Sequence, residues 1–472
     1  MARVERIVFL SLVLDLFAFT IPLPLFPRII EWYTKRESFD SHGLLSRTLA
    51  FVSSIRGLFY SSAQNSQRWD VVLLGGLMGS VFSTLQFIVS PIIGSLSDKH
   101  GRKKILLLTM LGNILSAVVW VKSTTFASYM LSRIIGGLSE GNVQLAIAIL
   151  SDVTTPETRS KALAHVGIAF AICFCIGPPI GAYFASRPVS IGSSFGLELN
   201  IYAAPALLTL VLLLLETLFL VLALPETRGR GPAKSVKPTE VNSVGKKSNG
   251  TVASPRLSRA STVEKRISLL KSLQHLHFLF LGVFSGVEFT LTFLTFDLFD
   301  WNNTQNGKLI GMIGIVSALL QGGYVRRSLT RVGELNMARH GVLFCALGLV
   351  FLSLIPRFVS TQPGIAVRLL QAAAVCLAFT SATVVNSLTA HASLQCDEGV
   401  DADSGKLVQG PPELAKGKAL GNFRSSGQLG RAIGPLLACA TYWTFGPAAT
   451  YAASAVAMGG LAFKMRRLGA TL

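Results

Sequence analysis

The chain has 472 residues, of which 50% are hydrophobic and only 14% are charged, and its formal net charge at pH 7 is +19. A soluble domain carries about a quarter of charged residues, so the composition excludes an ordinary water-soluble core. The basic residues lie in short segments between apolar runs, which indicates orientation in a membrane rather than nucleic-acid binding.

Twelve apolar segments are long enough to cross a bilayer, because about 20 residues span its hydrocarbon core. In chain order they lie at 6–26, 71–96, 103–122, 126–150, 160–186, 201–224, 274–299, 308–326, 338–357, 364–394, 417–443 and 447–465. Six precede a long polar stretch and six follow it. The sequence therefore predicts an all-α membrane protein of twelve transmembrane helices in two six-helix bundles.

The distribution of basic residues predicts the orientation of these spans. Alternate loops carry most of the Lys and Arg, so by the positive-inside rule both termini are expected in the cytoplasm. The loop at 27–70 carries charges of both signs and is expected on the opposite side, where long translocated loops follow the rule weakly. The first apolar run has no small-residue cleavage site, which favours a retained first span rather than a cleaved signal peptide. The protein is expected in the plasma membrane or an endomembrane.

Two polar segments interrupt the apolar pattern. Residues 225–272 are rich in Ser, Pro, Lys and Arg and are expected to form a disordered cytoplasmic linker, and 395–417 a flexible loop. The linker divides the chain into an expected N-terminal bundle at 1–224 and an expected C-terminal bundle at 273–472.

Short matches relate the two halves. The KAL and IGP tripeptides of 161–178 recur at the same spacing in 418–435, and Asp15 aligns with Glu288. Together the matches indicate two parallel six-helix halves, an architecture of secondary transporters whose binding site lies at the bilayer midplane.

The segment GSLSDKHGRK (94–103) follows the order G-x-L-x-D-x-x-G-R-K. It resembles the signature between the second and third helices of the major facilitator superfamily. IGPPIG (176–181) is similar to the fifth-helix motif of its proton-coupled drug antiporters, although Cys173 and Ala182 stand where that motif has Gly. PETR (225–228), at the end of the sixth span, is also common in the superfamily.

Three further stretches resemble the tetracycline-transporter-like proteins of eukaryotes: FSGVEFTLTFLTF (284–296), QGGYVRRSL (321–329) and FRSSGQLGRAIGPLLACATYW (423–443). This resemblance implies a transporter of amphipathic organic anions or drugs that works by alternating access. The fifth-helix motif favours proton-coupled antiport.

Acidic residues inside the spans are candidates for proton coupling. An ionisable side chain at bilayer depth usually faces a cavity or a partner, and a buried carboxyl group can change protonation in the physiological range. Asp15 and Glu288 are expected at equivalent depths and are the best candidates, and Glu140 is a third candidate. The alternative, a permanently paired or protonated packing residue, stays open. Glu216 in the sixth span is set aside as uninformative.

Arginines inside the spans are candidates for substrate binding. Arg133 and Glu140 are seven residues apart on the fourth helix, and Arg424 and Arg431 are seven apart on the eleventh, so each pair shares a face. The planar guanidinium suits anionic groups, and Arg431 is the first choice. Ion pairs with neighbouring helices are the alternative, and for Arg424, which is closer to the cytoplasmic end, snorkelling towards the cytoplasm is a further alternative. The substrate-binding prediction comprises Arg431, Arg424, Arg133, Phe19 and Phe289.

The resemblance implies that residues 94–103 form a gate. Asp98 is expected to cap the start of the eleventh helix at 417–421, and Arg102 to reach Asp152 at the end of the fourth. The counterpart segment 322–334 lacks the Asp, so the gate is assigned to one side only. The gating prediction comprises Gly94, Asp98, Gly101, Arg102, Asp152, Gly177, Pro178, Gly181, Gly434 and Pro435.

Other classes of function remain as alternatives. An uncoupled facilitator is the nearest, and a receptor or scaffold with the same fold but no transport is the next. The sequence shows no clustered metal ligands, nucleophile elbow or phosphate loop, so no enzyme, metal or cofactor is expected. The expected partners are a small-molecule substrate, protons and the lipid bilayer, with no nucleic acid, and the chain is expected to be a monomer.

Overall fold

The computed structural model describes residues 3–22, 25–37, 39–40, 42–59, 66–185, 202–228, 255–301, 303–396 and 411–470. Over these residues the chain forms helices and turns but no strand. The helices are α1 (Arg3–Thr20), α2 (Phe26–Arg36), α3 (Leu44–Phe59), α4 (Ser66–His100), α5 (Arg102–Val121), α6 (Phe126–Ser139), α7 (Asn142–Val153), α8 (Pro156–Ala185), α9 (Ala203–Ala223), α10 (Pro255–Phe299), α11 (Asn303–Leu319), the π-helix η3 (Leu320–Val325), α12 (Arg326–Val332), α13 (Glu334–Phe358), α14 (Pro363–Leu394) and α15 (Lys416–Ala470).

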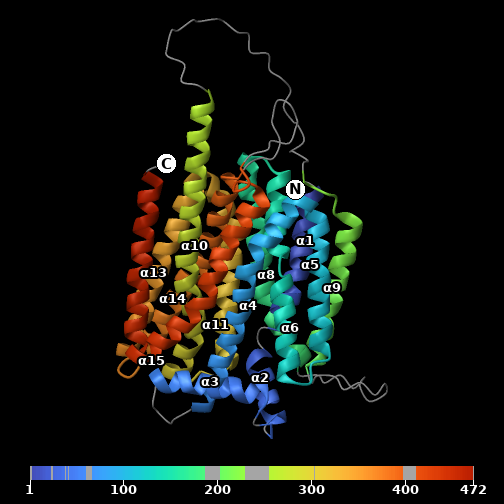
Figure 1. The fold of residues 1–472 in the computed structure, drawn as a ribbon. Helices are drawn as coiled ribbons and strands as arrows, with labels where there is room; N and C mark the ends of the chain where they lie inside the picture. Colours follow the sequence, from blue (N-terminus) through green and yellow to red (C-terminus); the bar gives the residue numbers. More distant parts are fainter. Residues whose placement is uncertain are drawn as a thin grey trace, which may run out of the picture.

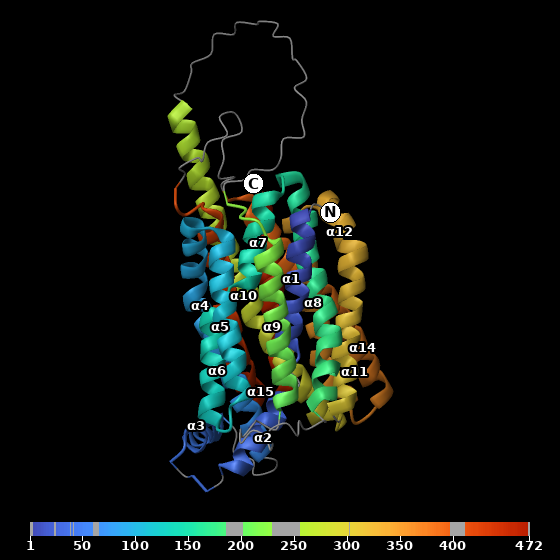
Figure 2. The same ribbon diagram turned by 90° about the vertical axis from the view of Figure 1, so that its right-hand side faces the viewer.

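The long helices lie side by side and run from one end of the molecule to the other (Figures 1 and 2). Within the described ranges, nine helical segments are long and apolar enough to cross a membrane. Helix α1 runs beside them. So do the two long parts of α15, which join at a kink at Gly446, where φ is 80°. The prediction of a twelve-helix membrane protein in two bundles is confirmed.

Each half has its own apolar core. One cluster joins α1, α5, α8 and α9 through residues such as Leu12, Ala169 and Leu213. The other joins α10, α13, α14 and α15 through residues such as Leu349 and Leu377. The halves meet where α4 packs along α15 and where α8 packs along α11 and α14.

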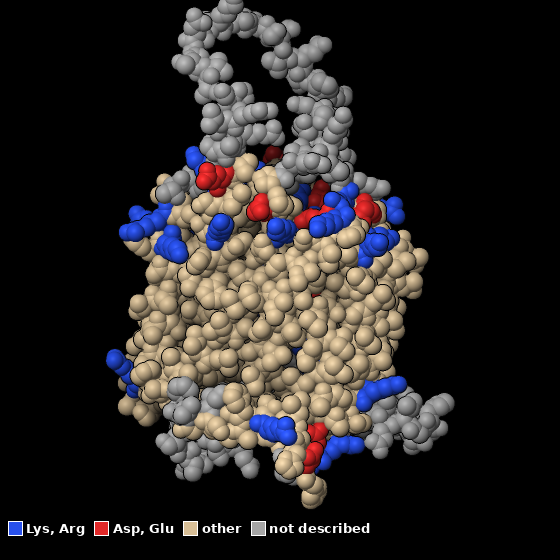
Figure 3. Space-filling model, in the orientation of Figure 1, with Lys and Arg blue, Asp and Glu red and all other residues tan. Residues whose placement is uncertain are grey.

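Both chain ends lie at the same end of the molecule, which we call the terminal end (Figure 1). Lys and Arg side chains gather in a band there, above a broad uncharged belt (Figure 3). Large apolar side chains such as Leu108, Leu111 and Leu115 of α5 and Leu218 and Leu222 of α9 are exposed. Exposure of such side chains is favourable in lipid and costly in water.

The predicted fourth span is interrupted. Helix α6 ends at Ser139 and α7 begins at Asn142, so Glu140 and Gly141 lie outside both helices. Glu140 is extended, with φ −71° and ψ 98°. The backbone passes close to α4 here, because a Cβ on Gly141 would lie 2.9 Å from Ile93 Cγ2.

Helix α10 begins at Pro255, far before the predicted start at residue 274. Val263, Ile267 and Leu270 follow one another at helical spacing and pack against the core of the second half, which explains the extension. Residues 255–272 of the predicted linker are therefore helical, whereas 229–254, like 397–410 of the second polar segment, lie outside the described residues.

Helices α2 and α3 lie at the end opposite the terminal end (Figure 1). The Tyr33 hydroxyl of α2 donates a 3.0 Å hydrogen bond to Ser123 O, and Glu37 accepts a 2.6 Å bond from the N–H of Phe126. These bonds join α2 to the first half. On α3, Val52 is buried against Phe293 and Cys439 of the second half.

Candidate functional site

A cavity lies inside the first half, between α1, α4, α5, α6 and α9. It is lined by Asp15, Phe19, Arg133 and Glu140, four residues of the predicted site. The space that a water-sized molecule can reach is about 70 Å³, whereas sites for drug-sized ligands are about 300–1,000 Å³. In this conformation the cavity has room for water or a small headgroup but not for a whole drug.

Asp15 is the central acidic residue of this cavity. Its Oδ1 accepts a 2.6 Å hydrogen bond from Asn142 Nδ2, and Asn142 Oδ1 accepts a 3.1 Å bond from Thr109. Asn142 is the first residue of α7, so the break after α6 places its amide opposite Asp15. The charges of Glu140 and Arg424 also act on Asp15.

Arg424 and Glu140 join the two halves. Arg424 Nη2 on α15 lies 4.0 Å from Glu140 Oε1, and both side chains are largely buried. The alternative that Arg424 snorkels towards the terminal end does not hold, because its guanidinium lies beside a carboxylate inside the bundle. Arg133 has its guanidinium over the Phe82 ring, 4.5 Å from the centroid.

The predicted residues of the second half form a separate group. Arg431 of α15 is the cation that acts on Glu288 of α10, and neither residue lines the cavity that contains Asp15. Phe289 lies at the seam between the halves, since a Cβ on Gly76 of α4 would be 2.7 Å from Phe289 Cζ. The structure thus divides the predicted site into a group around Asp15 and a group around Glu288.

Two residues near Asp15 were missed by the sequence reasoning, and a third, Glu216, was set aside. Trp120 and Tyr129 line the cavity, and within the described part of the chain the indole N–H and the phenol have no hydrogen-bond partner. Glu216 of α9 is 1% exposed and accepts a 2.6 Å bond from Ser11. A signal for Glu216 was available: it is the one charged residue in α9, whose mean hydropathy of 2.7 is the highest among the nine apolar segments.

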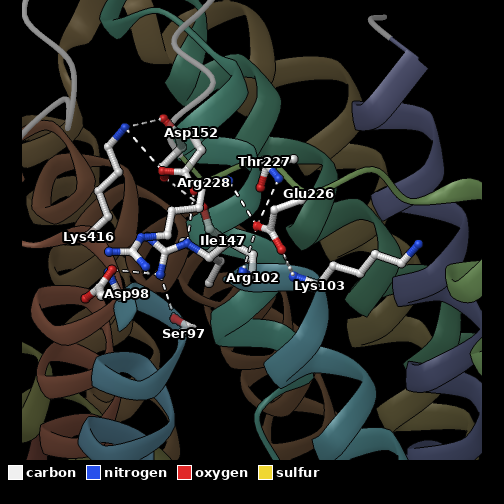
Figure 4. Close-up of polar contacts among 12 residues, drawn as sticks. Ser97, Asp98, Arg102, Lys103, Ile147, Asp152, Glu226, Thr227, Arg228 and Lys416 are labelled. Carbon is white, nitrogen blue, oxygen red and sulfur yellow. Dashed lines mark hydrogen bonds and ion pairs between the residues drawn. The ribbon is translucent and has the colours of Figure 1, made fainter. Parts of the chain in front are cut away.

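Asp98 caps the start of α15 across the halves, as the sequence predicts. Its Oδ1 accepts a 2.9 Å bond from the N–H of Gly417, and its Oδ2 a 2.7 Å bond from the N–H of Lys418. These are free amides of the first turn of α15, where a carboxylate is favourable. Arg102 joins Asp98 at 2.8 Å to Asp152 at 2.9 Å (Figure 4). We call this set of contacts the Asp98 latch.

Neighbouring groups hold the latch in place. Lys416 Nζ donates a 2.8 Å bond to Ser151 O and lies 3.5 Å from Asp152. Glu226, in the PETR segment, accepts bonds from the N–H of Arg102 at 2.8 Å and of Lys103 at 3.1 Å, and so caps α5 (Figure 4). Gly101 precedes this cap with a φ of 101°, a conformation that disfavours other residues.

The remaining predicted gating residues are sites of close helix packing. A Cβ on Gly94 would lie 2.1 Å from Gly417 O across the halves. In α8, a Cβ on Gly177, next to Pro178, would clash with Oγ1 of Thr20, the last residue of α1. A Cβ on Gly181 would clash with the carbonyl O of Ile21, which follows α1. In α15, next to Pro435, a Cβ on Gly434 would lie 2.1 Å from Gly282 O of α10.

A second set of contacts joins the halves at the terminal end. Ser160 of α8 donates a 2.6 Å bond to Glu334 of α13, and Arg159 donates a 3.2 Å bond to Ser393 O of α14. Glu334 directly follows Gly333, which has a positive φ of 82°, at the end of the 322–334 segment. Contacts between the halves therefore occur on this side as well, whereas the assignment of the gate to one side only stays a prediction.

Two six-helix halves, with charged side chains meeting between them, define the class of secondary transporters. The family model of the Major Facilitator Superfamily matches residues 8–400, and the chain belongs to this superfamily.

Several relatives refine this assignment. The chain is 34% identical over 458 residues to the human "Major facilitator superfamily domain-containing protein 10", covering 95% of this chain and 89% of the relative. It is 27% identical over 247 residues to the class H tetracycline resistance protein of Pasteurella multocida, covering 52% of this chain and 55% of the relative.

Solved structures agree with this assignment. The fold is similar to the human organic anion transporter MFSD10 (TETRAN), with a TM-score of 0.77 and 30% identity over 98% of this chain and 99% of that one. It is also similar in fold to the proton:xylose symporter XylE, with a TM-score of 0.63 and 13% identity over 98% of this chain and 95% of that one.

Proposed function

We propose that this protein is a secondary active transporter of amphipathic organic anions or drugs, coupled to protons and working by alternating access. The observation that carries the proposal is the Arg424–Glu140 ion pair, which joins the halves beside a cavity that also holds Asp15 and Arg133. The description of the human structural neighbour as an organic anion transporter supports the substrate class.

The halves at 1–224 and 273–472 are proposed to rock against each other as the two moving bundles of one monomer. The terminal end is proposed to face the cytoplasm. Both termini and most of the Lys and Arg side chains lie there, which is the distribution that the positive-inside rule expects (Figure 3). The Asp98 latch is then a cytoplasmic gate that is closed in this conformation.

The charge pairs suggest how substrate and protons share the site. An anion that enters between the halves competes with Glu140 for Arg424, and with Glu288 for Arg431. A proton on either carboxyl group removes its negative charge and releases the guanidinium for the anion. Phe19 and Phe289, which lie nearby on α1 and α10, would contact the apolar part of the substrate.

The direction of proton movement distinguishes two forms of this function. The fifth-helix motif at 176–181 favours antiport. The Arg424–Glu140 pair favours the second candidate, symport, because protonation of Glu140 and binding of the anion at Arg424 promote each other. An uncoupled facilitator would show neither linkage.

The test is uptake of a radiolabelled aromatic carboxylate into proteoliposomes with an imposed pH gradient, with internal pH recorded by an encapsulated dye. Asp15→Asn and Glu288→Gln are expected to abolish gradient-driven uptake, and Arg431→Ala to weaken affinity for the carboxylate. Asp297→Asn, which changes a carboxyl group outside both groups of the site, is the matched control. Gradient-driven uptake that survives both acidic substitutions overturns the assignment of proton coupling to Asp15 and Glu288, and wild-type uptake that ignores the pH gradient overturns proton coupling itself. The sign of the pH change separates antiport from symport.

A further inference from the structure

Glu216 is a buried acidic residue that the proposed transport mechanism does not use. Its helix, α9, packs against α1, α5 and α8, and its side chain is 1% exposed. One carboxyl oxygen, Oε1, accepts a 2.6 Å hydrogen bond from Ser11 of α1. The other oxygen, Oε2, is buried and has no hydrogen-bond partner among the described residues.

Among the described residues, the charges that act on Glu216 are those of two other carboxyl groups. They are Asp15 of α1 and Glu140, which lies between α6 and α7. Basic residues of the packed helices are engaged elsewhere: on α5, Arg102 pairs with Asp98 and Asp152 and Lys103 donates to Val221 O. On α8, Arg159 donates to Ser151 O and Ser393 O, and the His165 ring bonds to Ala162 O.

This environment is unfavourable for an ionised carboxylate. A charge without a cation in a medium of low dielectric constant costs many kcal/mol, and in practice such a group becomes neutral. A buried oxygen without a partner adds to that cost when it carries charge. Glu216 is therefore suited to hold a proton.

The position of Glu216 relative to Asp15 connects it to the cavity. Ser11 and Asp15 are one helical turn apart on α1 and lie on the same face. Asp15 lines the cavity, whereas Glu216 does not and lies against α1 through Ser11. Asp15 is thus the member of the pair that meets cavity water, and Glu216 is the inner member.

We propose that Glu216 is a second proton-binding site of the transport cycle, which keeps its proton while Asp15 exchanges its own with the cavity. The inference rests on the proposed proton coupling. Two neighbouring carboxyl groups do not ionise together, because the first negative charge opposes the second. The pair is expected to lose its protons in two separate steps.

Infrared spectroscopy of the full-length protein in lipid vesicles tests this directly, through the carbonyl stretch of protonated carboxylic acids. At neutral pH, Glu216→Gln is expected to lower the intensity of that band by the contribution of one carboxylic acid. Gln keeps the shape of the side chain and the bond from Ser11 but has no acid proton. Asp297→Asn is the control and leaves that contribution in place. An unchanged band in Glu216→Gln means that Glu216 is ionised and overturns the proposal.

A second variant tests the hydrogen bond itself. Ser11→Ala removes the donor, so the band component that Glu216→Gln abolishes is expected to remain but to shift in frequency. A component that Ser11→Ala leaves at its original frequency contradicts the assignment to Glu216.

Transport measurements then separate this proposal from the proposed function. In Glu216→Gln, gradient-driven uptake of the aromatic carboxylate is expected to lose one of two steps in its pH profile, with carboxylate affinity changed less than twofold. An unaltered two-step profile overturns the role of Glu216 in the cycle. If uptake by the unaltered protein does not respond to the pH gradient, the proposed proton coupling is overturned, while the infrared band still shows whether Glu216 holds a proton.

Discussion

Arg424 on α15 and Glu140, in the break between α6 and α7, form an ion pair of 4.0 Å that crosses from one half of the molecule to the other. The pair lies beside the cavity that contains Asp15. Any rocking motion that separates the halves at this level must stretch or break it. Its strength therefore contributes both to stability and to the balance between conformations.

Glu140→Gln is predicted to destabilise the protein by about 3–5 kcal/mol, because it leaves the largely buried Arg424 without its acidic partner. Thermal unfolding in detergent measures this loss. The double variant Glu140→Gln with Arg424→Gln is expected to recover part of the stability, since it removes the unpaired charge as well. Glu413→Gln, which changes an exposed carboxylate, is the control. Strict additivity of the two single effects contradicts the pairing.

Asp98→Asn is predicted to shift the protein towards the state that is open at the terminal end, by a factor of about ten or more. In Asn one of the two carboxylate oxygens is replaced by an NH2 donor, so either Gly417 or Lys418 loses its acceptor. The negative charge that faces Arg102 is lost as well. Distances between spin labels on the two halves measure the shift. Binding of the aromatic carboxylate is expected to persist, and its loss speaks against a gate.

Ser160→Ala is predicted to shift the same equilibrium in the same direction but less, because it removes one hydrogen bond to Glu334 rather than a network. The shifts of Ser160→Ala and Asp98→Asn are expected to add in free energy, since the contacts share no side chain. The same spin-label distances report both. No effect of Ser160→Ala, alone or in combination, refutes the role of the second contact set.

Gly434→Ala is predicted to lower the unfolding temperature, because its Cβ would lie 2.1 Å from Gly282 O, a backbone atom that cannot move aside. Overpacking of this kind costs about 1–3 kcal/mol or more. Gly459→Ala on the same helix meets nothing within 4 Å and is expected to be neutral or stabilising by up to about 1 kcal/mol. Equal effects of the two substitutions contradict the packing argument.

The twelve helices were predictable from apolar segment length because the bilayer sets that length. The Asp98 contacts were predictable because the resemblance carries their spacing. The break at Glu140 and Gly141 was not, since both residues sit inside an apolar pattern and the close passage to Ile93 depends on α4. The helical extension at 255–272 was hidden by its high content of basic residues, although its apolar residues follow helical spacing.

The site was predicted less completely than the fold. Asp15, Arg133 and Glu140 do line one cavity, but Glu288 and Arg431 do not join it. Contacts such as Ser160 with Glu334 join residues 174 positions apart and depend on how the halves pack. Their roles in coupling, binding and gating stay predictions that the variants above test.

Helices α2 and α3 give the end opposite the termini a second use. Hydrogen bonds of Tyr33 and Glu37 attach α2 to one half, while Val52 of α3 rests on the other. An antibody fragment raised against the α2–α3 surface would bind a segment whose contacts with the two halves change when the halves separate. Such a reagent would select one conformation from outside the bundle, and would serve as an inhibitor that never enters the substrate site.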